Sequence, residues 1–276
     1  MIVVDTVQGL RSARGSLAEP LGFVPTMGFL HAGHMALIEA ARAQNASVAV
    51  SIFVNPKQFG PNEDFATYPR DLDRDLAMLR DAGVDLVFVP SVEEMYPPDF
   101  STTVDVGPIG EILEGARRPG HFRGVATVVA RLFGLFQPRR AYFGQKDAQQ
   151  CVVVKRLVAD LGLPLEIVVI PTVREPDGLA LSSRNIYLNS EERVAARVLS
   201  ESLRLVEKHF RDGQTDAEAL RRLVRDTVSR EPLVRLDYIS VADAATLSEL
   251  TVVDRPALVS MAAWVGRARL IDNIVL

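Results

Sequence analysis

The sequence predicts an α/β fold in which a doubly wound parallel sheet is followed by a smaller α+β domain. Up to about residue 172, short apolar runs alternate with segments of helical period, which is the pattern of βαβ units. After Pro171 the chain instead carries a polar loop, two long helices and three β-rich runs. The chain has 276 residues, 48% of them hydrophobic, which is enough to bury a large core without an external staple.

The first domain, residues 1–172, is expected to be Rossmann-like. Its predicted strands are 22–26, 48–54, 86–89, 141–143 and 165–170. The predicted helices are 34–44, 71–83, 124–136 and 147–162, two of them ended by Gly83 and Gly162. Sheets of this type bind ligands at the carboxyl ends of their strands, so the loops after the strands are where we expect chemistry.

The second domain, residues 173–276, is expected to combine helices with a small antiparallel sheet. Helices are predicted over 190–212 and 215–230, the second opened by a capping box of Thr215 and Glu218. Three β-rich runs, "VRLDYISV", "ALVSMAAWV" and "ARLIDNIVL", follow. We expect this domain to close over a site formed by the first.

Composition favours small molecules as partners, although local basic clusters stay possible. The net charge of −4 gives no general attraction to nucleic acid. The beginning has no secretory pattern, and no run reaches the roughly 18 apolar residues of a membrane span, which predicts a cytoplasmic protein. The single cysteine, Cys151, heads an apolar run and is expected to be a buried hydrophobe.

Two histidines stand between a predicted strand and a predicted helix. In "PTMGFLHAGHMALIEAAR" the strand ends at Thr26, Gly28 lets the chain turn, and His31 and His34 come at the start of the helix. Free backbone N–H groups and the positive end of the dipole make a helix N-terminus an anion site, and histidines there can donate to phosphate oxygens. Solvated loop histidines are the alternative. The spacing H-x-G-H resembles the motif of the nucleotidylyltransferase superfamily, which implies attack on the α-phosphate of ATP.

Two further segments fit a triphosphate. Ser182, Ser183 and Arg184 in "GLALSSRNIYL" combine hydroxyls with a guanidinium, both suited to phosphate oxygens, although a polar interdomain loop would look similar. In "YFGQKDAQQ", Lys146 supplies a point charge at a strand end. Asp147 there also fits a capping box with Gln150 and can be purely structural.

An uncharged amide is placed to recognise a substrate. Gln58 in "SIFVNPKQF" follows a strand end, and its amide can meet both a hydroxyl and a carboxylate. By itself this segment reads as an ordinary loop. It indicates a substrate site only together with the histidine motif, the serine-arginine segment and the lysine segment.

Taken in order, the motifs P-T-M-G-x-L-H-x-G-H, F-V-N-P-x-Q-F, Y-P-R, H-F-R-G-V, F-G-x-K-D-x-Q-Q and P-T-V-R-E-x-D-G-L-A-x-S-S-R-N resemble the pantothenate synthetase family. They run from residue 23 to about residue 188. The resemblance implies condensation of pantoate with β-alanine, using ATP, through a pantoyl-adenylate and with release of AMP and pyrophosphate. It also implies a homodimer.

The resemblance carries site residues over one by one. It makes His34 the general acid, with His31, Lys146, Ser182, Ser183 and Arg184 beside it in catalysis, and it makes Gln58 and Gln150 the amides that hold pantoate, Gln58 also lying near β-alanine. The ATP site that it implies consists of Met27, Gly28, Phe29, Leu30, His31, Ala32, Gly33, His34, Gly144, Gln145, Lys146, Asp147, Val173, Leu181, Ser182, Ser183 and Arg184.

One position departs from the family, which usually has Glu where this chain has Gln145. Lys146 can still make the main phosphate contact, so ATP binding should survive. Mg²⁺ is expected with ATP, since it binds phosphates plus one or two carboxylates. In the acidic run Asp71, Asp73 and Asp75, an exposed helix start is expected for most of the three.

The segment 107–124 corresponds to a mobile wall over the cavity in the family, and its glycines and prolines fit a lid. Arg117, Arg118, His121 and Arg123 there either meet phosphate or carboxylate or face water. Two other functions stay open: an adenylyltransferase that leaves AMP on its product, and a catalytically silent nucleotide-binding protein.

Overall fold

The computed structural model describes residues 1–61 and 63–276 and divides into two compact units. Unit 1 comprises Met1–Gly144 and Val153–Ile170, and unit 2 comprises Gln145–Val152 and Pro171–Leu276. The chain therefore enters unit 2 briefly at residue 145, inside the predicted first domain, before it leaves unit 1 at residue 170. The predicted division after residue 172 takes no account of that excursion.

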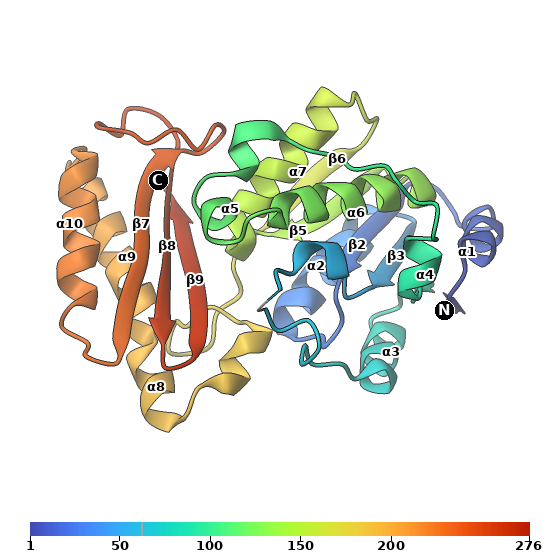
Figure 1. Cartoon of the computed structure of the whole chain (residues 1–276), viewed down its shortest axis with the longest axis horizontal. Helices are drawn as coiled ribbons and strands as arrows, with labels where there is room; N and C mark the ends of the chain where they lie inside the picture. The colour runs from blue at the N-terminus through green and yellow to red at the C-terminus, as the bar shows by residue number, and fades with distance from the viewer. Residues whose placement is uncertain (62) are drawn as a thin grey trace. The chain divides into compact units, whose positions relative to one another are not determined.

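Unit 1 is built on a six-stranded sheet in the order β1-β4-β3-β2-β5-β6, and every pair in it is parallel (Figure 1). The order reverses direction between β2 and β5, which makes the sheet doubly wound and confirms the predicted fold class. The strands are β1 (Ile2–Val4), β2 (Leu21–Thr26), β3 (Ser47–Ile52), β4 (Leu86–Phe88), β5 (Arg140–Gly144) and β6 (Glu166–Ile170).

Helices cover both faces of this sheet. They are α1 (Val7–Arg14), α2 (Ala32–Gln44), α3 (Leu72–Asp81), α4 (Val92–Met95), α5 (Glu114–Arg117), α6 (His121–Phe136) and the later part of α7 (Ala148–Asp160), with 3-10 turns η1 (Pro56–Gln58) and η2 (Gly107–Gly110). The turn η3 (Gln145–Asp147) and the start of α7 belong to unit 2. Neighbouring residues of β2 show the two faces. Val24 is buried in one cluster with Ile38 of α2 and Leu79 of α3, whereas the ring of Phe23 stacks on Phe136 of α6 at 4.2 Å.

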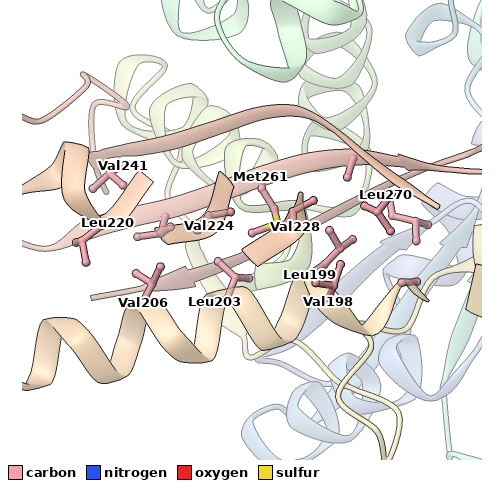
Figure 2. Packing of buried hydrophobic residues seen from close by; sticks show 14 of the residues in the cluster. Val198, Leu199, Leu203, Val206, Leu220, Val224, Val228, Val241, Met261 and Leu270 are labelled. Atoms are coloured by element: carbon pink, nitrogen blue, oxygen red, sulfur yellow. The ribbon is translucent and has the colours of Figure 1, made fainter. Parts of the chain in front are cut away.

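Unit 2 packs two helices on an antiparallel sheet. The sheet has the order β7-β8-β9, with β7 (Val234–Asp243), β8 (Ala257–Val265) and β9 (Ala268–Val275). Its helices are α8 (Ser190–Ala195), α9 (Arg197–Arg211) and α10 (Ala217–Val228), with the turn η4 (Ser183–Tyr187) before them. Figure 2 shows Leu203 of α9 and Val224 of α10 among the buried side chains that meet Met261 of β8.

Two helix predictions in unit 2 were wrong in detail. The single helix expected over 190–212 is two helices, because the N–H of Leu199 donates to the carbonyl of Ala196 and the chain makes a tighter turn there. The N-cap of α10 is Asp216 rather than Thr215, since the Asp216 carboxylate accepts from the N–H groups of Glu218 and Ala219.

Two further findings bear on the composition argument. Cys151 is 3% exposed, which confirms the predicted buried hydrophobe. Among the helices of the described residues, none combines the length and the apolar character that crossing a membrane requires.

Candidate active site

One group of predicted site residues follows two neighbouring strands of unit 1. β2 and β3 pair in register, with Thr26 opposite Ile52 at their carboxyl ends. Parallel strands end at the same edge of a sheet, so the loops that follow, residues 27–34 and residues 53–58, begin side by side. The N–H of Phe53 donates to the carbonyl of Thr26 over 3.0 Å and joins their starts. We call residues 27–34 the histidine turn.

A buried carboxylate fixes the histidine turn. Asp75 on α3 is 1% exposed, and its Oδ2 and Oδ1 accept the N–H groups of Phe29 and Leu30, each over 2.7 Å. Gly28 and Phe29 have φ values of 81° and 51°, in the left-handed region. A Cβ on Gly28 would lie 3.0 Å from Asp75 Oδ2 and also from Ile52 Cγ2, so a larger residue has no room. The two hydrogen bonds therefore stabilise a backbone shape that is unfavourable by itself.

Asp75 is the exception in its acidic run. Asp71 and Asp73 are exposed, as expected for an exposed helix start. Asp75 lies one turn before the buried Leu79, so it shares the face of α3 that packs inward. A charged residue in phase with the apolar face of a helix is the signal that would have singled it out.

Both histidines take part in the helix start. His31 is the N-cap of α2, and its Nδ1 accepts the N–H of Gly33 at 3.1 Å. His34 Nδ1 in turn accepts the N–H of His31 at 3.3 Å, which completes a capping box. The two rings lie with their centroids 4.1 Å apart.

These contacts define which ring nitrogen carries the proton. A nitrogen that accepts from a backbone N–H has its lone pair there and no proton, so each neutral imidazole is protonated at Nε2. His31 and His34 therefore present Nε2–H groups as donors, both from the same helix start. Such a pair of donors suits the oxygens of one phosphate group.

The backbone donors of this turn are mostly occupied within the protein. The N–H groups of Phe29 and Leu30 go to Asp75, that of Gly33 goes to His31, and that of His34 donates to the His31 carbonyl over 2.8 Å. The expectation of free backbone N–H groups at the start of α2 is wrong for these positions. Donors to an anion must come from the imidazoles instead.

Gln58 is oriented by Asn55. Asn55 Oδ1 accepts the N–H of Lys57 at 3.2 Å, and Asn55 Nδ2 donates to the carbonyl of Gly124 at 3.1 Å. These two backbone groups fix the orientation of the Asn55 amide. Its Nδ2 also donates to Gln58 Oε1 over 3.1 Å. Gln58 Nε2 is then turned the other way, toward the weak acceptor Met27 Sδ at 3.2 Å. The donor end of Gln58 is the end available to a ligand.

The close approach of α6 to η1 supports this arrangement. A Cβ on Gly124 would lie 2.2 Å from the Lys57 carbonyl oxygen, so only glycine allows the contact. The hydroxyl of Tyr96 donates to Asn55 Oδ1 over 2.8 Å, and burial raises the pKa of Tyr96. Sequence reasoning missed Asn55, although its place between a strand and Pro56 is that of a loop residue beside Gln58.

The predicted lid residues have different roles. Arg118 makes a two-pronged ion pair with Glu63, with its Nε 2.8 Å and its Nη2 2.5 Å from the carboxylate oxygens, and His121 Nδ1 lies 2.9 Å from the Gln58 carbonyl oxygen. Burial, and then the charge of Arg118, lowers the pKa of His121 to about 4. Burial alone would raise the pKa of Glu63, but Arg118 outweighs it and lowers that pKa. Arg123 instead pairs with Asp105 at 2.9 Å, with both side chains about half exposed.

Another group of predicted site residues lies in unit 2 and begins where β5 ends. We call residues 145–147, which form η3, the lysine turn. Lys146 Nζ lies 3.4 Å from Asp147 Oδ1 in a weak ion pair. The side-chain Nε2 of Gln145 donates to Asn273 Oδ1 over 2.9 Å. Gln150, one turn into the same helical segment, is half-buried.

The serine-arginine segment is reached by a short hairpin in unit 2. The N–H of Leu181 donates to the Val173 carbonyl over 3.0 Å, and Arg174 forms a bridge with Ala180. Ser182 is the N-cap of η4, since its Oγ accepts the Arg184 N–H at 3.2 Å. The Ser182 hydroxyl hydrogen can still be donated outward.

Strand β9 contributes two residues that sequence reasoning did not select. Asp272 pairs with Arg174 through both carboxylate oxygens, at 2.6 and 2.8 Å, and Asn273 contacts Gln145 and Lys146. They are 2% and 4% exposed. Two adjacent polar residues inside the apolar run "ARLIDNIVL" are the signal that was available. Among the residues that the structure describes, no group of three or more His, Cys, Asp or Glu side chains could hold a metal ion.

Comparison with known proteins gives one consistent result. The family model described as pantoate-beta-alanine ligase matches residues 2–275. A pantothenate synthetase of Herpetosiphon aurantiacus is 58% identical over 277 residues, covering 100% of both chains. One from Chloroflexus aurantiacus is 60% identical, covering 100% of this chain and 98% of the relative.

Solved structures agree. The crystal structure of pantothenate synthetase from Thermus thermophilus has a TM-score of 0.95 and 53% identity, covering 99% of each chain. The pantoate-beta-alanine ligase from Francisella tularensis, solved in complex with beta-gamma ATP and beta-alanine, has a TM-score of 0.80 and 39% identity, covering 100% of this chain and 97% of that one.

Proposed function

The chain belongs to the pantoate–β-alanine ligase family, whose enzymes join pantoate to β-alanine with ATP to give pantothenate, AMP and pyrophosphate, and we propose that the histidine and lysine turns carry out that reaction here. The single observation that carries the assignment is the pair of imidazoles whose Nδ1 atoms accept backbone N–H groups. That arrangement keeps the proton of each neutral ring on Nε2, and two N–H donors at one helix start suit the phosphate charge of the first step.

In the first step a carboxylate oxygen of pantoate attacks the α-phosphorus of ATP. A new P–O bond forms, the bond to the bridging oxygen breaks, and pyrophosphate leaves with those electrons. His34 acts as general acid toward the leaving group, and His31 and Lys146 stabilise negative charge on the phosphates. Ser182, Ser183 and Arg184 add neutral and charged donors. Positioning and electrostatics supply most of the acceleration.

In the second step the amine of β-alanine attacks the acyl carbon of the adenylate. The C–N bond forms, the C–O bond to AMP breaks, and the amine gives up a proton. Water would hydrolyse the same acyl phosphate, so the site must exclude it. We propose that unit 2 supplies this protection by closing over the site, as the resemblance implies for residues 173–276.

Pantoate is recognised by amides. Gln58 offers its Nε2–H₂ end, because Asn55 occupies its oxygen, and that end suits the carboxylate or a hydroxyl oxygen of pantoate. Gln150 supplies the second amide. The rest of the ATP site is assigned to Met27, Gly28, Phe29, Leu30, Ala32, Gly33, Gly144, Gln145, Asp147, Val173 and Leu181.

Mg²⁺ enters this proposal with ATP. We propose that the phosphates are the main ligands of the ion, since Mg²⁺ usually binds through substrate phosphates with one or two carboxylates. Bound there, it would neutralise phosphate charge. We further propose a cytoplasmic homodimer. Light scattering that gives the mass of one chain would refute the dimer.

The test is a pyrophosphate-release assay with each substrate omitted in turn. We expect release with ATP and pantoate, and free AMP only when β-alanine is also present. AMP retained on the product would identify an adenylyltransferase, and no release at all would identify a silent nucleotide-binding protein. His34→Ala should fold and lose at least tenfold in the rate of the first step, since one donor to developing charge is removed.

A further inference from the structure

A third strand of the parallel sheet contributes a side chain beside Gln58. β4 pairs with β3 in parallel, with Phe88 opposite Ser51, and α4 follows β4. Tyr96 comes directly after α4, and its hydroxyl donates to Asn55 Oδ1 over 2.8 Å. The segment after β4 thereby reaches the segment after β3, which carries Gln58.

The ring of Tyr96 is fixed by its neighbours. Lys57 Nζ lies over it, 4.7 Å from its centroid, and the ring of Phe100 meets it edge to face with the centroids 5.1 Å apart. The ring of Phe53 lies on it at a centroid distance of 6.1 Å. Burial raises the pKa of Tyr96, so its hydroxyl keeps its proton at neutral pH and stays a donor.

Every hydrogen-bonding position of the Asn55 amide is used. Its Oδ1 accepts from the N–H of Lys57 and from the Tyr96 hydroxyl, and its Nδ2 donates to the Gly124 carbonyl and to Gln58 Oε1. Asn55 is 1% exposed, so these bonds are shielded from water. The hydroxyl, at 2.8 Å, is the closer of the two donors to Oδ1, since the N–H of Lys57 lies at 3.2 Å.

The orientation of Asn55 determines which end of Gln58 faces outward. With Asn55 Nδ2 donating to its Oε1, Gln58 has its Nε2–H₂ group left for a ligand. If Asn55 were turned over, its oxygen would attract that NH₂ group, and Gln58 would present an acceptor instead. An acceptor there would face the carboxylate or a hydroxyl oxygen of pantoate unfavourably. Each bond that holds Asn55 therefore favours the orientation of Gln58 that suits an acceptor.

We propose that Tyr96 is a positioning residue for pantoate, which acts through Asn55 on the amide of Gln58. The proposal rests on the pantoate-binding role given above to Gln58. Tyr96 needs no contact with the substrate, because its hydroxyl only keeps the donor end of Gln58 outward.

The first test removes the hydroxyl alone. Tyr96→Phe keeps the ring and its packing, and Asn55 Oδ1 keeps only the longer of its two hydrogen bonds. We expect KM for pantoate to rise about threefold to fivefold, in the range of one neutral hydrogen bond, and KM for ATP to change by less than about twofold. Initial-rate kinetics with each substrate varied in turn give both values. Wild-type KM for pantoate in Tyr96→Phe, or an equal rise for both substrates, would overturn the proposal.

A double-mutant cycle shows whether Tyr96 acts through Gln58. In Gln58→Ala the hydroxyl has no amide left to orient. The double variant Tyr96→Phe/Gln58→Ala should therefore have the same KM for pantoate as Gln58→Ala. If the two residues acted independently, their effects would multiply, and a further rise of about threefold or more in the double variant would contradict the proposal.

Tyr142→Phe is the matched control, because it makes the same change at a buried tyrosine of unit 1. The Tyr142 hydroxyl bonds Asn45 and Gln44 at the far end of α2, about 20 Å from the end that carries His31. We expect lower stability and wild-type KM for both substrates. Loss of folded protein lowers the apparent kcat and leaves KM unchanged, so the control separates destabilisation from positioning. A rise in KM for pantoate in Tyr142→Phe as large as that in Tyr96→Phe would show a general effect of a lost buried hydroxyl and refute the proposal.

Gln58→Ala by itself distinguishes this failure from failure of the proposed function. If Gln58→Ala raises KM for pantoate and Tyr96→Phe does not, only the role of Tyr96 is wrong. If Gln58→Ala leaves KM for pantoate at the wild-type value, Gln58 does not bind pantoate, and both the proposed role of Gln58 and that of Tyr96 are wrong.

Discussion

The histidine turn and the lysine turn are each fixed by one buried polar side chain, but with opposite polarity. Asp75 accepts two N–H groups of the histidine turn, whereas Asn273 donates to two carbonyl groups of the lysine turn. The N–H and C=O of a trans peptide point in opposite directions. The histidine turn therefore directs its N–H groups inward, and the lysine turn directs its carbonyls inward and its N–H groups away from Asn273.

This difference explains which groups each turn can offer to ATP. With its backbone donors directed at Asp75, the histidine turn relies on the two imidazoles. The lysine turn offers the Lys146 ammonium, which lies 3.4 Å from Asp147 Oδ1. In the function proposed above, the two buried anchors therefore leave the imidazoles of one turn and the ammonium of the other to meet phosphate.

Replacing the charge of the lysine turn should have the largest effect. Lys146→Met keeps most of the apolar stem and removes the cation, so adenylate formation should fall by about 100-fold or more, as for loss of one preorganised electrostatic donor. Rapid-quench measurement of pyrophosphate in a single turnover gives this rate. Lys155→Met, at an exposed position of α7, should have the wild-type rate; a loss there as large as in Lys146→Met would contradict the assignment.

A change at Asp75, which fixes the histidine turn, should have the second-largest effect. Asp75→Asn replaces one acceptor with an NH₂ that faces a backbone N–H, so we expect about 1–3 kcal/mol of lost stability and about a tenfold slower first step. Urea unfolding and single-turnover rates measure the two effects. Asp73→Asn makes the same change at an exposed position of the same helix and should leave both unchanged.

A change at Gln58 tests whether pantoate is recognised separately from ATP. Gln58→Ala should raise KM for pantoate by up to about tenfold, the value of one well-placed hydrogen bond of about 1.4 kcal/mol, and leave KM for ATP nearly unchanged. Initial-rate kinetics with each substrate varied would show this. If KM for ATP rose instead, Gln58 would belong with the turns.

The smallest effect concerns His121, whose contact with the Gln58 carbonyl is sensitive to pH. Its pKa of about 4 in the folded chain lies below the unfolded value of 6.5, so the unfolded state binds the proton first as pH falls. Stability should be complete above 6.5 and decline from there toward 4, by about 1 kcal/mol over the first pH unit. The urea midpoint of unfolding, plotted against pH, should fall more steeply for the wild type than for His121→Gln across that range. Parallel plots would refute the shifted pKa.

Much of the fold followed from local pattern. Runs of apolar residues located β2 to β6, because buried parallel strands are nearly continuous in hydrophobicity. β1 and α1 were missed, since β1 is a short and largely exposed run and α1 is a polar helix. The break at Ala196 could not be found from pattern alone, because alanine is compatible with either turn geometry.

Residues that would touch ligand were easier to select than those that orient them. His31, His34, Lys146 and Gln58 stand in motifs with polar chemistry at strand ends. Asp75 and Asn273 act over distances of 45 and 127 residues along the sequence, which no local pattern encodes. Only the three-dimensional contacts showed that most backbone N–H groups of the histidine turn already donate to acceptors within the protein.

The most direct test of this account is a long-range ¹H–¹⁵N correlation spectrum of the imidazoles, in a chain with only four histidines. We expect His31 and His34 to be protonated at Nε2 and unprotonated at Nδ1, and their Nε2–H signals to shift when a non-hydrolysable ATP analogue and Mg²⁺ are added. A proton at Nδ1 of either ring, or Nε2–H signals unmoved at saturating analogue, would contradict the claim that the histidine turn meets phosphate through its side chains.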